Sequence, residues 1–226
     1  MRGMILAAGR GLRMEELTDH TPKPLLRVGD CYLIEYAIHA LIKRGIQDIV
    51  INVSYQREKI ISTLGDGKRY GVTLHYSEEV LALETGGGIY QALPLLGKDP
   101  FIVLSCDIIS DYALERLPTK LDGVAHLVLI DNPEFNVRGD FNLTGNLVNC
   151  DAPCRLTYAN IGVLHPDLFA NCQPGRFKLG DLLKGQATQH QVTGEYFQGF
   201  WRNLGTKEQL REAHESVLSG ACVLSS

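Results

Sequence analysis

The sequence predicts an α/β fold in which helices cover both faces of a mixed, mostly parallel sheet, giving a three-layer αβα sandwich. Short apolar runs alternate with helical patterns through the first half of the chain, as is typical of βαβ units. The second half has closely spaced strand patterns and a hairpin signal at Thr144-Gly145, which predicts antiparallel pairing there. The 226 residues contain no repeat or low-complexity linker, so we expect one domain over residues 1–226.

Each element of this fold follows from a local pattern. Short apolar runs bounded by turn residues predict strands at residues 4–8, 48–53, 72–76, 100–105, 123–130, 156–164 and 196–200. Apolar residues at helical spacing predict helices at residues 33–43, 56–64, 87–96, 166–170, 179–186 and 207–217. The first four strands and their intervening helices would form the parallel part of the sheet.

Composition excludes several classes of function. The formal net charge is only −4 and both signs are mixed along the chain, so the sequence shows no footprint for nucleic acid or an anionic membrane. No apolar run reaches the roughly 18 residues of a membrane span, and Met1-Arg2-Gly3 leads directly into a strand rather than a signal peptide. We therefore expect a cytoplasmic protein; no feature predicts its oligomeric state.

The cysteines and histidines show no metal-binding pattern. The cysteines have no CxxC pairing, and a chain of this size needs no disulfides to fold, so we expect reduced thiols at Cys31, Cys106, Cys150, Cys154, Cys172 and Cys222. The histidines likewise lack ligand spacing.

A glycine-rich loop follows the first predicted strand and includes Ala8, Gly9, Gly11 and Arg13. Ligands of parallel sheets bind at the carboxyl ends of strands. Glycines let the backbone approach a polyphosphate closely, and a guanidinium adds charge-assisted bonds to phosphate oxygens. An ordinary glycine turn is the alternative, and Met14 stands where the last glycine of a dinucleotide-binding GxGxxG would be, which argues against an oxidoreductase.

The segment Thr21-Pro22-Lys23-Pro24-Leu25 places one lysine between two stiff prolines. Alone it could be a turn with a solvated lysine. A Gly-x-Gly-x-Arg-Met loop followed by Thr-Pro-Lys-Pro-Leu resembles the signature of the sugar-1-phosphate nucleotidyltransferases. The resemblance implies a Rossmann-like fold of the nucleotide-diphospho-sugar transferase type, with the glycine loop around a triphosphate and Arg13 and Lys23 on its phosphates. One departure is Glu16, where that family usually has proline.

A second glycine cluster, Glu84-Thr85-Gly86-Gly87-Gly88, precedes a helical pattern. Free N–H groups at a helix start could receive base or phosphate oxygens, although a flexible capped turn is the alternative. In the family this loop lies against the nucleobase, and its E-T-G-G-G form resembles the N-acetylmuramic acid 1-phosphate uridylyltransferases. Glu84, Gly86 and Gly87 are therefore nucleotide-binding candidates.

Asp107 follows a buried strand, where it could cap a helix or offer a hard cation an oxygen ligand. The family's use of such an aspartate implies Mg²⁺ at Asp107. A second metal-binding aspartate of the family falls at Asn203, within Trp201-Arg202-Asn203-Leu204-Gly205-Thr206. An amide oxygen can coordinate Mg²⁺ but brings no charge, and Arg202 beside it would oppose a cation or bind phosphate.

Segments that resemble the lining of the family's sugar pocket contain Asp140, Asn160 and Glu195. Each could contact sugar hydroxyls or could be a solvated turn residue. The resemblance spans nearly the whole chain, and we expect no C-terminal left-handed β-helix of the kind found in bifunctional relatives.

The resemblance implies a Mg²⁺-dependent enzyme that transfers a nucleotidyl group from an NTP to a sugar 1-phosphate and releases pyrophosphate. UTP with N-acetylmuramic acid 1-phosphate is the leading pair, because of the ETGGG loop. GTP with mannose 1-phosphate, or another hexose 1-phosphate, is the alternative. A different hypothesis is a catalytically impaired relative that only binds nucleotide, since Asn203 replaces the usual aspartate.

Overall fold

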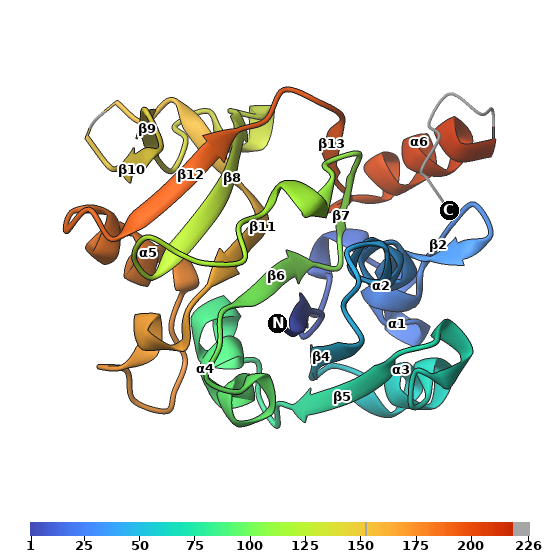
Figure 1. Cartoon of the computed structure of the whole chain (residues 1–226). Helices are drawn as coiled ribbons and strands as arrows, with labels where there is room; N and C mark the ends of the chain where they lie inside the picture. Colours follow the sequence, from blue (N-terminus) through green and yellow to red (C-terminus); the bar gives the residue numbers. More distant parts are fainter. Residues whose placement is uncertain (152, 219–226) are drawn as a thin grey trace.

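The computed structural model describes residues 1–151 and 153–218, and Cys222 lies outside them. A nine-stranded sheet runs through the molecule in the order β5-β4-β1-β6-β11-β8-β12-β10-β9 (Figure 1). Its strands are β1 (Gly3–Leu6), β4 (Asp48–Val53), β5 (Thr73–Glu78), β6 (Phe101–Ser105), β8 (Ala125–Asp131), β9 (Asn142–Thr144), β10 (Leu147–Asn149), β11 (Leu156–Leu164) and β12 (Val192–Tyr196). All but β10 and β11 run in the same direction, as predicted for a mostly parallel mixed sheet.

Helices cover both faces of this sheet. One face carries α2 (Leu33–Lys43) and α3 (Arg57–Leu64), whose apolar residues share a core with β4 and β6. The other face carries α4 (Glu84–Leu96) and α5 (Leu179–Ala187), which pack on a second core. The buried strands are almost wholly apolar, as expected for a sheet covered on both sides. The three-layer prediction is confirmed.

Short elements lie outside the main sheet. Two small antiparallel pairs are formed by β2 (Arg27–Val28) with β3 (Cys31–Tyr32), and by β7 (Ile108–Ser110) with β13 (Trp201–Asn203). The last helix, α6 (Lys207–Leu218), packs against β2 through Ala213 (Figure 1). The remaining elements are α1 (Leu17–His20) and the 3-10 helices η1 (Leu12–Met14), η2 (Lys23–Leu25), η3 (Lys68–Tyr70), η4 (Leu114–Arg116), η5 (Glu134–Asn136) and η6 (Pro166–Phe169).

Most predicted boundaries lie within two residues of those in the structure, and three elements differ by more or in type. The strand expected at 196–200 is β12, which pairs with β8 from Val192 onward and ends at Tyr196. The helix expected at 166–170 is only a 3-10 turn, in which the N–H groups of Leu168 and Ala170 donate to carbonyls three residues back and the His165 side chain accepts the N–H of Asp167. The helix expected from Gly87 begins at Glu84, since a carbonyl distant in sequence caps its first turn.

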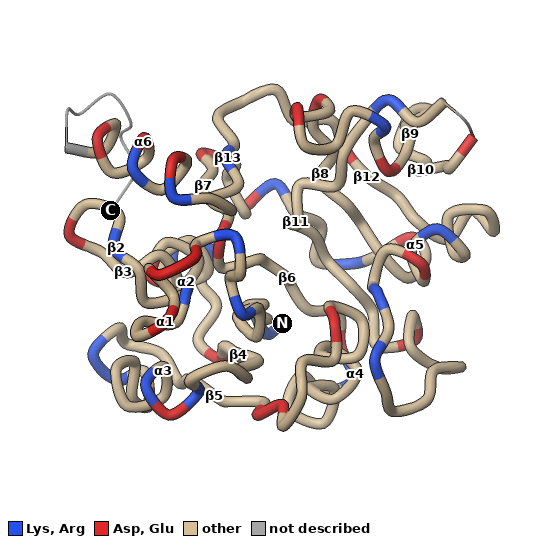
Figure 2. The backbone as a smooth tube through the Cα atoms, turned by 180° about the vertical axis from the view of Figure 1, so that it is seen from behind, with Lys and Arg blue, Asp and Glu red and all other residues tan. Residues whose placement is uncertain are grey.

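Charged residues of both signs are interspersed along the backbone, as Figure 2 shows. No helix among the described residues is long and apolar enough to cross a membrane. Cys31, Cys106, Cys150, Cys154 and Cys172 are free thiols in the structure.

Candidate active site

The glycine loop begins where β1 leaves the sheet. The N–H of Ala7 is held by the Asn52 side chain on β4, at 2.9 Å. Gly11 then adopts the left-handed region, with φ 69°, and starts η1, which carries Arg13. A Cβ on Gly11 would lie 3.0 Å from Cβ of Lys23, so the glycine loop packs directly on the Pro-Lys-Pro segment. Open space surrounds Gly9, where a Cβ would meet nothing within 4 Å.

Lys23 and Asp107 form an ion pair at the carboxyl ends of β1 and β6. Pro22 is extended, and its geometry sends the following η2 turn inward, so that the Lys23 side chain is only 9% exposed. Its ammonium contacts Oδ2 of Asp107, and Oδ1 accepts a 2.6 Å bond from the Ser105 hydroxyl. Two sequence-predicted residues 84 positions apart therefore meet at one point. Ser105, which orients the carboxylate, was not predicted.

The C-terminal segment closes this cluster. β13 pairs with β7 so that Asn203 lies opposite Ile108, and the N–H of Leu204 donates to the Asp107 carbonyl at 2.8 Å. A Cβ on Gly205 would stand 2.8 Å from Nη2 of Arg13, so the guanidinium packs on that glycine. Arg13, Lys23, Asp107 and Asn203 are thus brought together from four separate segments.

The donor set at Asp107 and Asn203 fits a magnesium ion. Oδ1 of Asn203 is buried and has no hydrogen-bond partner in the part of the chain that the structure describes. An amide oxygen without a competing donor is an available hard ligand. Mg²⁺ usually takes only one or two protein ligands and completes its shell with water and phosphate. No cluster of three or more His, Cys, Asp or Glu able to hold a metal occurs among the described residues.

Arg202 does not oppose a cation at this site. The alternation of β13 turns its side chain away from Asn203, and Nη1 lies 3.3 Å from Oε2 of Glu212 on α6.

The negative charge of Glu16, where the family usually has proline, is compensated by Lys207. Nζ of Lys207 lies 2.7 Å from Glu15 and 2.5 Å from Glu16. The hydrogen bond from Lys207 lowers the pKa of Glu16. The loop therefore adds little uncompensated negative charge.

The second glycine cluster forms the first turn of α4. Glu84 has φ 61° and pairs with Arg176 at 2.7 Å. The N–H groups of Gly86 and Gly87 both donate to the carbonyl of Phe177, at 3.0 and 3.1 Å. The expectation of free N–H groups at these two glycines was therefore wrong. A Cβ on Gly87 would lie 2.2 Å from the Gly175 carbonyl, so this glycine is required by close backbone approach.

The three sugar-pocket candidates differ in their surroundings. Oδ2 of Asp140 accepts the Tyr158 N–H at 3.0 Å, and Asn160, with φ 57°, lies in the irregular stretch of β11 that follows. Asp140 and Asn160 are therefore held by one strand. Glu195 instead contacts the Tyr112 hydroxyl and lies 2.8 Å from Arg116, so both its oxygens are engaged.

A buried polar pair between the two glycine loops was also not predicted. Asn52 and Glu79 are 3% and 1% exposed and hydrogen-bond to each other at 2.7 Å. The available signal was Asn52 itself, a polar residue within the apolar strand DIVINV.

Comparison with known proteins agrees with this geometry. The family described as Nucleotidyl transferase matches residues 2–129. The chain is 40% identical to the N-acetylmuramate alpha-1-phosphate uridylyltransferase of Neisseria meningitidis serogroup B, over 98% of this chain and 99% of the relative. The Caulobacter vibrioides protein of that name is 31% identical, over 96% and 97%. The mannose-1-phosphate guanyltransferase of Debaryomyces hansenii is 42% identical, over 52% of this chain and 33% of the relative.

The fold also matches a solved structure. A Bacillus anthracis protein, provisionally assigned as a glucose-1-phosphate thymidylyltransferase, superposes with a TM-score of 0.85 at 23% identity, covering 95% of this chain and 94% of that one. The family match covers more than half of the chain, and the two uridylyltransferases align along almost all of it. This chain belongs to the nucleotidyl transferase family.

Proposed function

We propose that this protein transfers a uridylyl group from UTP to N-acetylmuramate 1-phosphate, giving the UDP-sugar and pyrophosphate. The observation that carries the proposal is the gathering of Arg13, Lys23, Asp107 and Asn203 at the carboxyl ends of β1 and β6, in a chain that aligns over nearly its full length with two enzymes of that name. A cytoplasmic location is part of the proposal.

The chemistry needs positioning and charge neutralisation rather than a protein nucleophile. An oxygen of the sugar phosphate attacks the α-phosphorus of UTP in line, a new P–O bond forms, and pyrophosphate leaves from the opposite side. The attacking phosphate is already ionised, so no general base is required. Arg13 and Lys23 would offset the negative charge that collects in the transition state. Bound Mg²⁺, held by Asp107 and Asn203, would supply further electrostatic stabilisation.

Other candidates take roles around this centre. Ala8, Gly9 and Gly11 would follow the triphosphate, with the open space around Gly9 leaving room for it. Glu84, Gly86 and Gly87 remain nucleotide candidates through close approach of the α4 turn rather than through free N–H groups. On the sugar side, Asp140 and Asn160 are the better supported candidates. Glu195 would first have to leave Tyr112 and Arg116.

A guanylyltransferase acting on mannose 1-phosphate is the second candidate, favoured by the 42% identity of about half of the chain to the Debaryomyces hansenii enzyme. It stays second because this chain covers only 33% of that relative. An impaired nucleotide binder, motivated by Asn203, is the third.

Pyrophosphate release tests all three. The purified protein is mixed with MgCl₂, each NTP in turn, and N-acetylmuramate 1-phosphate, mannose 1-phosphate or another hexose 1-phosphate. Release with UTP and N-acetylmuramate 1-phosphate is expected, with loss on EDTA addition and in Asp107→Ala. Asp66→Ala, which removes an exposed carboxylate paired only with Lys68, is the matched control and should keep full activity. Faster release with GTP and mannose 1-phosphate would favour the second candidate. Release only after Asn203→Asp would favour the third.

A further inference from the structure

The two glycine loops are joined beneath their surface by a chain of hydrogen bonds. Oδ1 of Asn52 accepts the N–H of Ala7 at 2.9 Å, at the start of the first loop. Nδ2 of Asn52 donates to Oε1 of Glu79 at 2.7 Å. Oε2 of Glu79 accepts the N–H of Leu83 at 2.8 Å, immediately before the second loop. Two side chains therefore connect the backbones of both loops.

The chemistry of this connection requires a carboxylate at position 79. Asn52 must turn its amide nitrogen toward Glu79, because its oxygen is occupied by Ala7. Leu83 also presents a donor, so residue 79 must accept two hydrogen bonds and donate none. A buried carboxylate is costly unless its oxygens are satisfied. The hydrogen bonds at this buried position therefore require a glutamate, and an apolar side chain of similar size could not replace it.

The third glycine of the ETGGG motif makes room for the pair. A Cβ on Gly88 would lie 2.5 Å from Oε1 of Glu79 and 2.7 Å from Nδ2 of Asn52. The nucleotide contacts proposed for the motif involve Glu84, Gly86 and Gly87 and leave Gly88 without a role. Contact with Asn52 and Glu79 explains why a side chain is absent there.

We propose that Asn52 and Glu79 are positioning residues that set the spacing between the two nucleotide loops, and that they thereby determine the affinity for the NTP. The inference rests on the proposed function for the identity of the nucleotide. Neither side chain is a catalytic residue, since both are buried beneath the loops and act through Ala7 and Leu83. Breaking their contact should weaken NTP binding while leaving binding of the sugar phosphate nearly unchanged.

Exchanging the amide of Asn52 and the carboxylate of Glu79 between the two positions tests whether their contact sets the affinity for the NTP. In Glu79→Gln an amide must fit between two donors, so one buried donor loses its acceptor; in Asn52→Asp two carboxylates face each other. The double variant Asn52→Asp/Glu79→Gln restores a complete chain. The carboxylate introduced at position 52 would accept from Ala7 and from the new amide, and the amide oxygen introduced at position 79 would accept from the N–H of Leu83. Net charge and the number of hydrogen bonds then equal those of the wild type.

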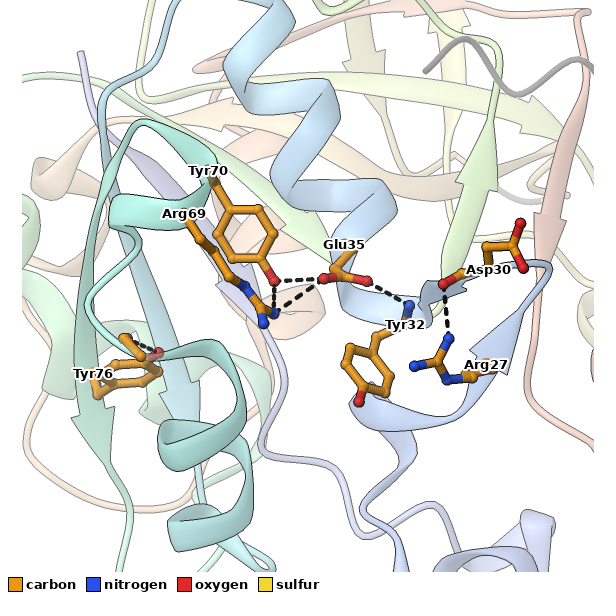
Figure 3. Close-up of polar contacts among 8 residues, drawn as sticks. Arg27, Asp30, Tyr32, Glu35, Arg69, Tyr70 and Tyr76 are labelled. Atoms are coloured by element: carbon orange, nitrogen blue, oxygen red, sulfur yellow. Dashed lines mark hydrogen bonds and ion pairs between the residues drawn. The ribbon is translucent and has the colours of Figure 1, made fainter.

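Glu35→Gln is the matched control. Figure 3 shows that Glu35 likewise accepts a backbone N–H near a helix start, from Tyr32 at 2.6 Å, together with side-chain donors from Tyr70 and Arg69 at 2.5 and 3.1 Å. It lies at the beginning of α2 and touches neither glycine loop in these contacts. The control therefore repeats the chemical change at a place where loop spacing is not involved.

UTP affinity is measured by calorimetry with MgCl₂, beside KM for both substrates. Each single variant should weaken UTP binding by about tenfold, Glu79→Gln because one buried donor loses its acceptor and Asn52→Asp because two buried carboxylates repel each other. The double variant should return to within about threefold of wild type, and Glu35→Gln should stay within about twofold. KM for the sugar phosphate should not change. Single variants that bind UTP normally, or a double variant no better than the weaker single one, would overturn the inference.

If one single variant does not fold, the other single variant and the double variant decide: UTP affinity higher in the double variant than in that single variant supports the inference, and no such recovery counts against it. Because binding is measured directly, the exchange remains informative even if the wild type releases no pyrophosphate. That result would reject the proposed reaction and not the positioning pair. If another NTP is the substrate, that NTP replaces UTP in the titration.

Discussion

Replacing Gly205 with alanine should misplace the guanidinium of Arg13 without unfolding the protein. The added Cβ would stand 2.8 Å from Nη2 and 3.1 Å from Cζ, and ordinary contact begins at 3.4 Å, so the guanidinium must shift by about 0.6 Å. The obstructing atoms are the end of a flexible side chain, which can move at little cost. The free energy of unfolding should therefore fall by less than about 1 kcal/mol.

Gly205→Ala should lower kcat/KM more than it lowers the free energy of unfolding. A displacement of about 0.6 Å of a group that neutralises transition-state charge can lower kcat/KM by roughly 10- to 100-fold. The assay is pyrophosphate release at varied UTP, with urea unfolding measured on the same preparation. Gly185→Ala in α5 is the control, because a Cβ there meets nothing within 4 Å.

The double variant Arg13→Ala/Gly205→Ala shows whether Gly205→Ala lowers activity through Arg13 or by another route. If Gly205→Ala acts by moving Arg13, it should have no further effect once the guanidinium is absent. Full activity of Gly205→Ala, or an undiminished additional loss in the double variant, would refute the reasoning that links the C-terminal segment to Arg13.

Three further outcomes follow from burial and backbone geometry. Burial lowers the pKa of His126, so the folded protein keeps the imidazole neutral and loses stability as the pH falls below about 6.5, where the unfolded chain takes up a proton. His126→Gln should therefore reduce the fall in unfolding free energy between pH 7.5 and 5.5, measured by urea titration. Burial raises the pKa of Cys106 to about 12, so iodoacetamide at pH 8 should leave it unmodified until the protein is denatured, as peptide mass spectrometry would show. Gly123→Ala should cost about 3 kcal/mol in urea unfolding, because φ is 112° and the Cβ would lie 2.3 Å from the Gln191 carbonyl; a loss below 1 kcal/mol would contradict this.

The sequence predicts best those features whose causes are local. Strand β4 and helix α2 occur where apolar periodicity places them, and the turn after Thr144 has φ 62° at Gly145, as its hairpin signal requires. The position of Asp107 is also predictable in outline, because it closely follows β6 and ligands of a parallel sheet bind at the carboxyl ends of its strands. Its ion pair with Lys23 depends on the path of the chain through η1 and α1, which no local pattern specifies.

Features that depend on distant segments could not be predicted. The start of α4 is set by the Phe177 carbonyl, about 90 residues further along the chain, and nothing local to Glu84 indicates that partner. The short strand β13 exists because it pairs with β7. Glu79 follows another glutamate in a polar segment, so periodicity alone would leave it in solvent, whereas Asn52 and Leu83 bury it.

Asn203 is the residue on which the distinction between enzyme and impaired binder depends, and its surroundings favour a ligand role. A buried carbonyl oxygen without a hydrogen-bond partner lowers the free energy of unfolding by about 1–3 kcal/mol. An asparagine without a ligand to bind would more readily pair with another protein group or be exposed to water. Arg202 turns away to Glu212, and the backbone next to Asn203 is joined to Asp107 through the N–H of Leu204. Asn203→Asp would add a second carboxylate near one already paired with Lys23. It should therefore tighten binding of Mg²⁺ and destabilise the metal-free protein, two opposite shifts that magnesium titration and urea unfolding would record on the same sample.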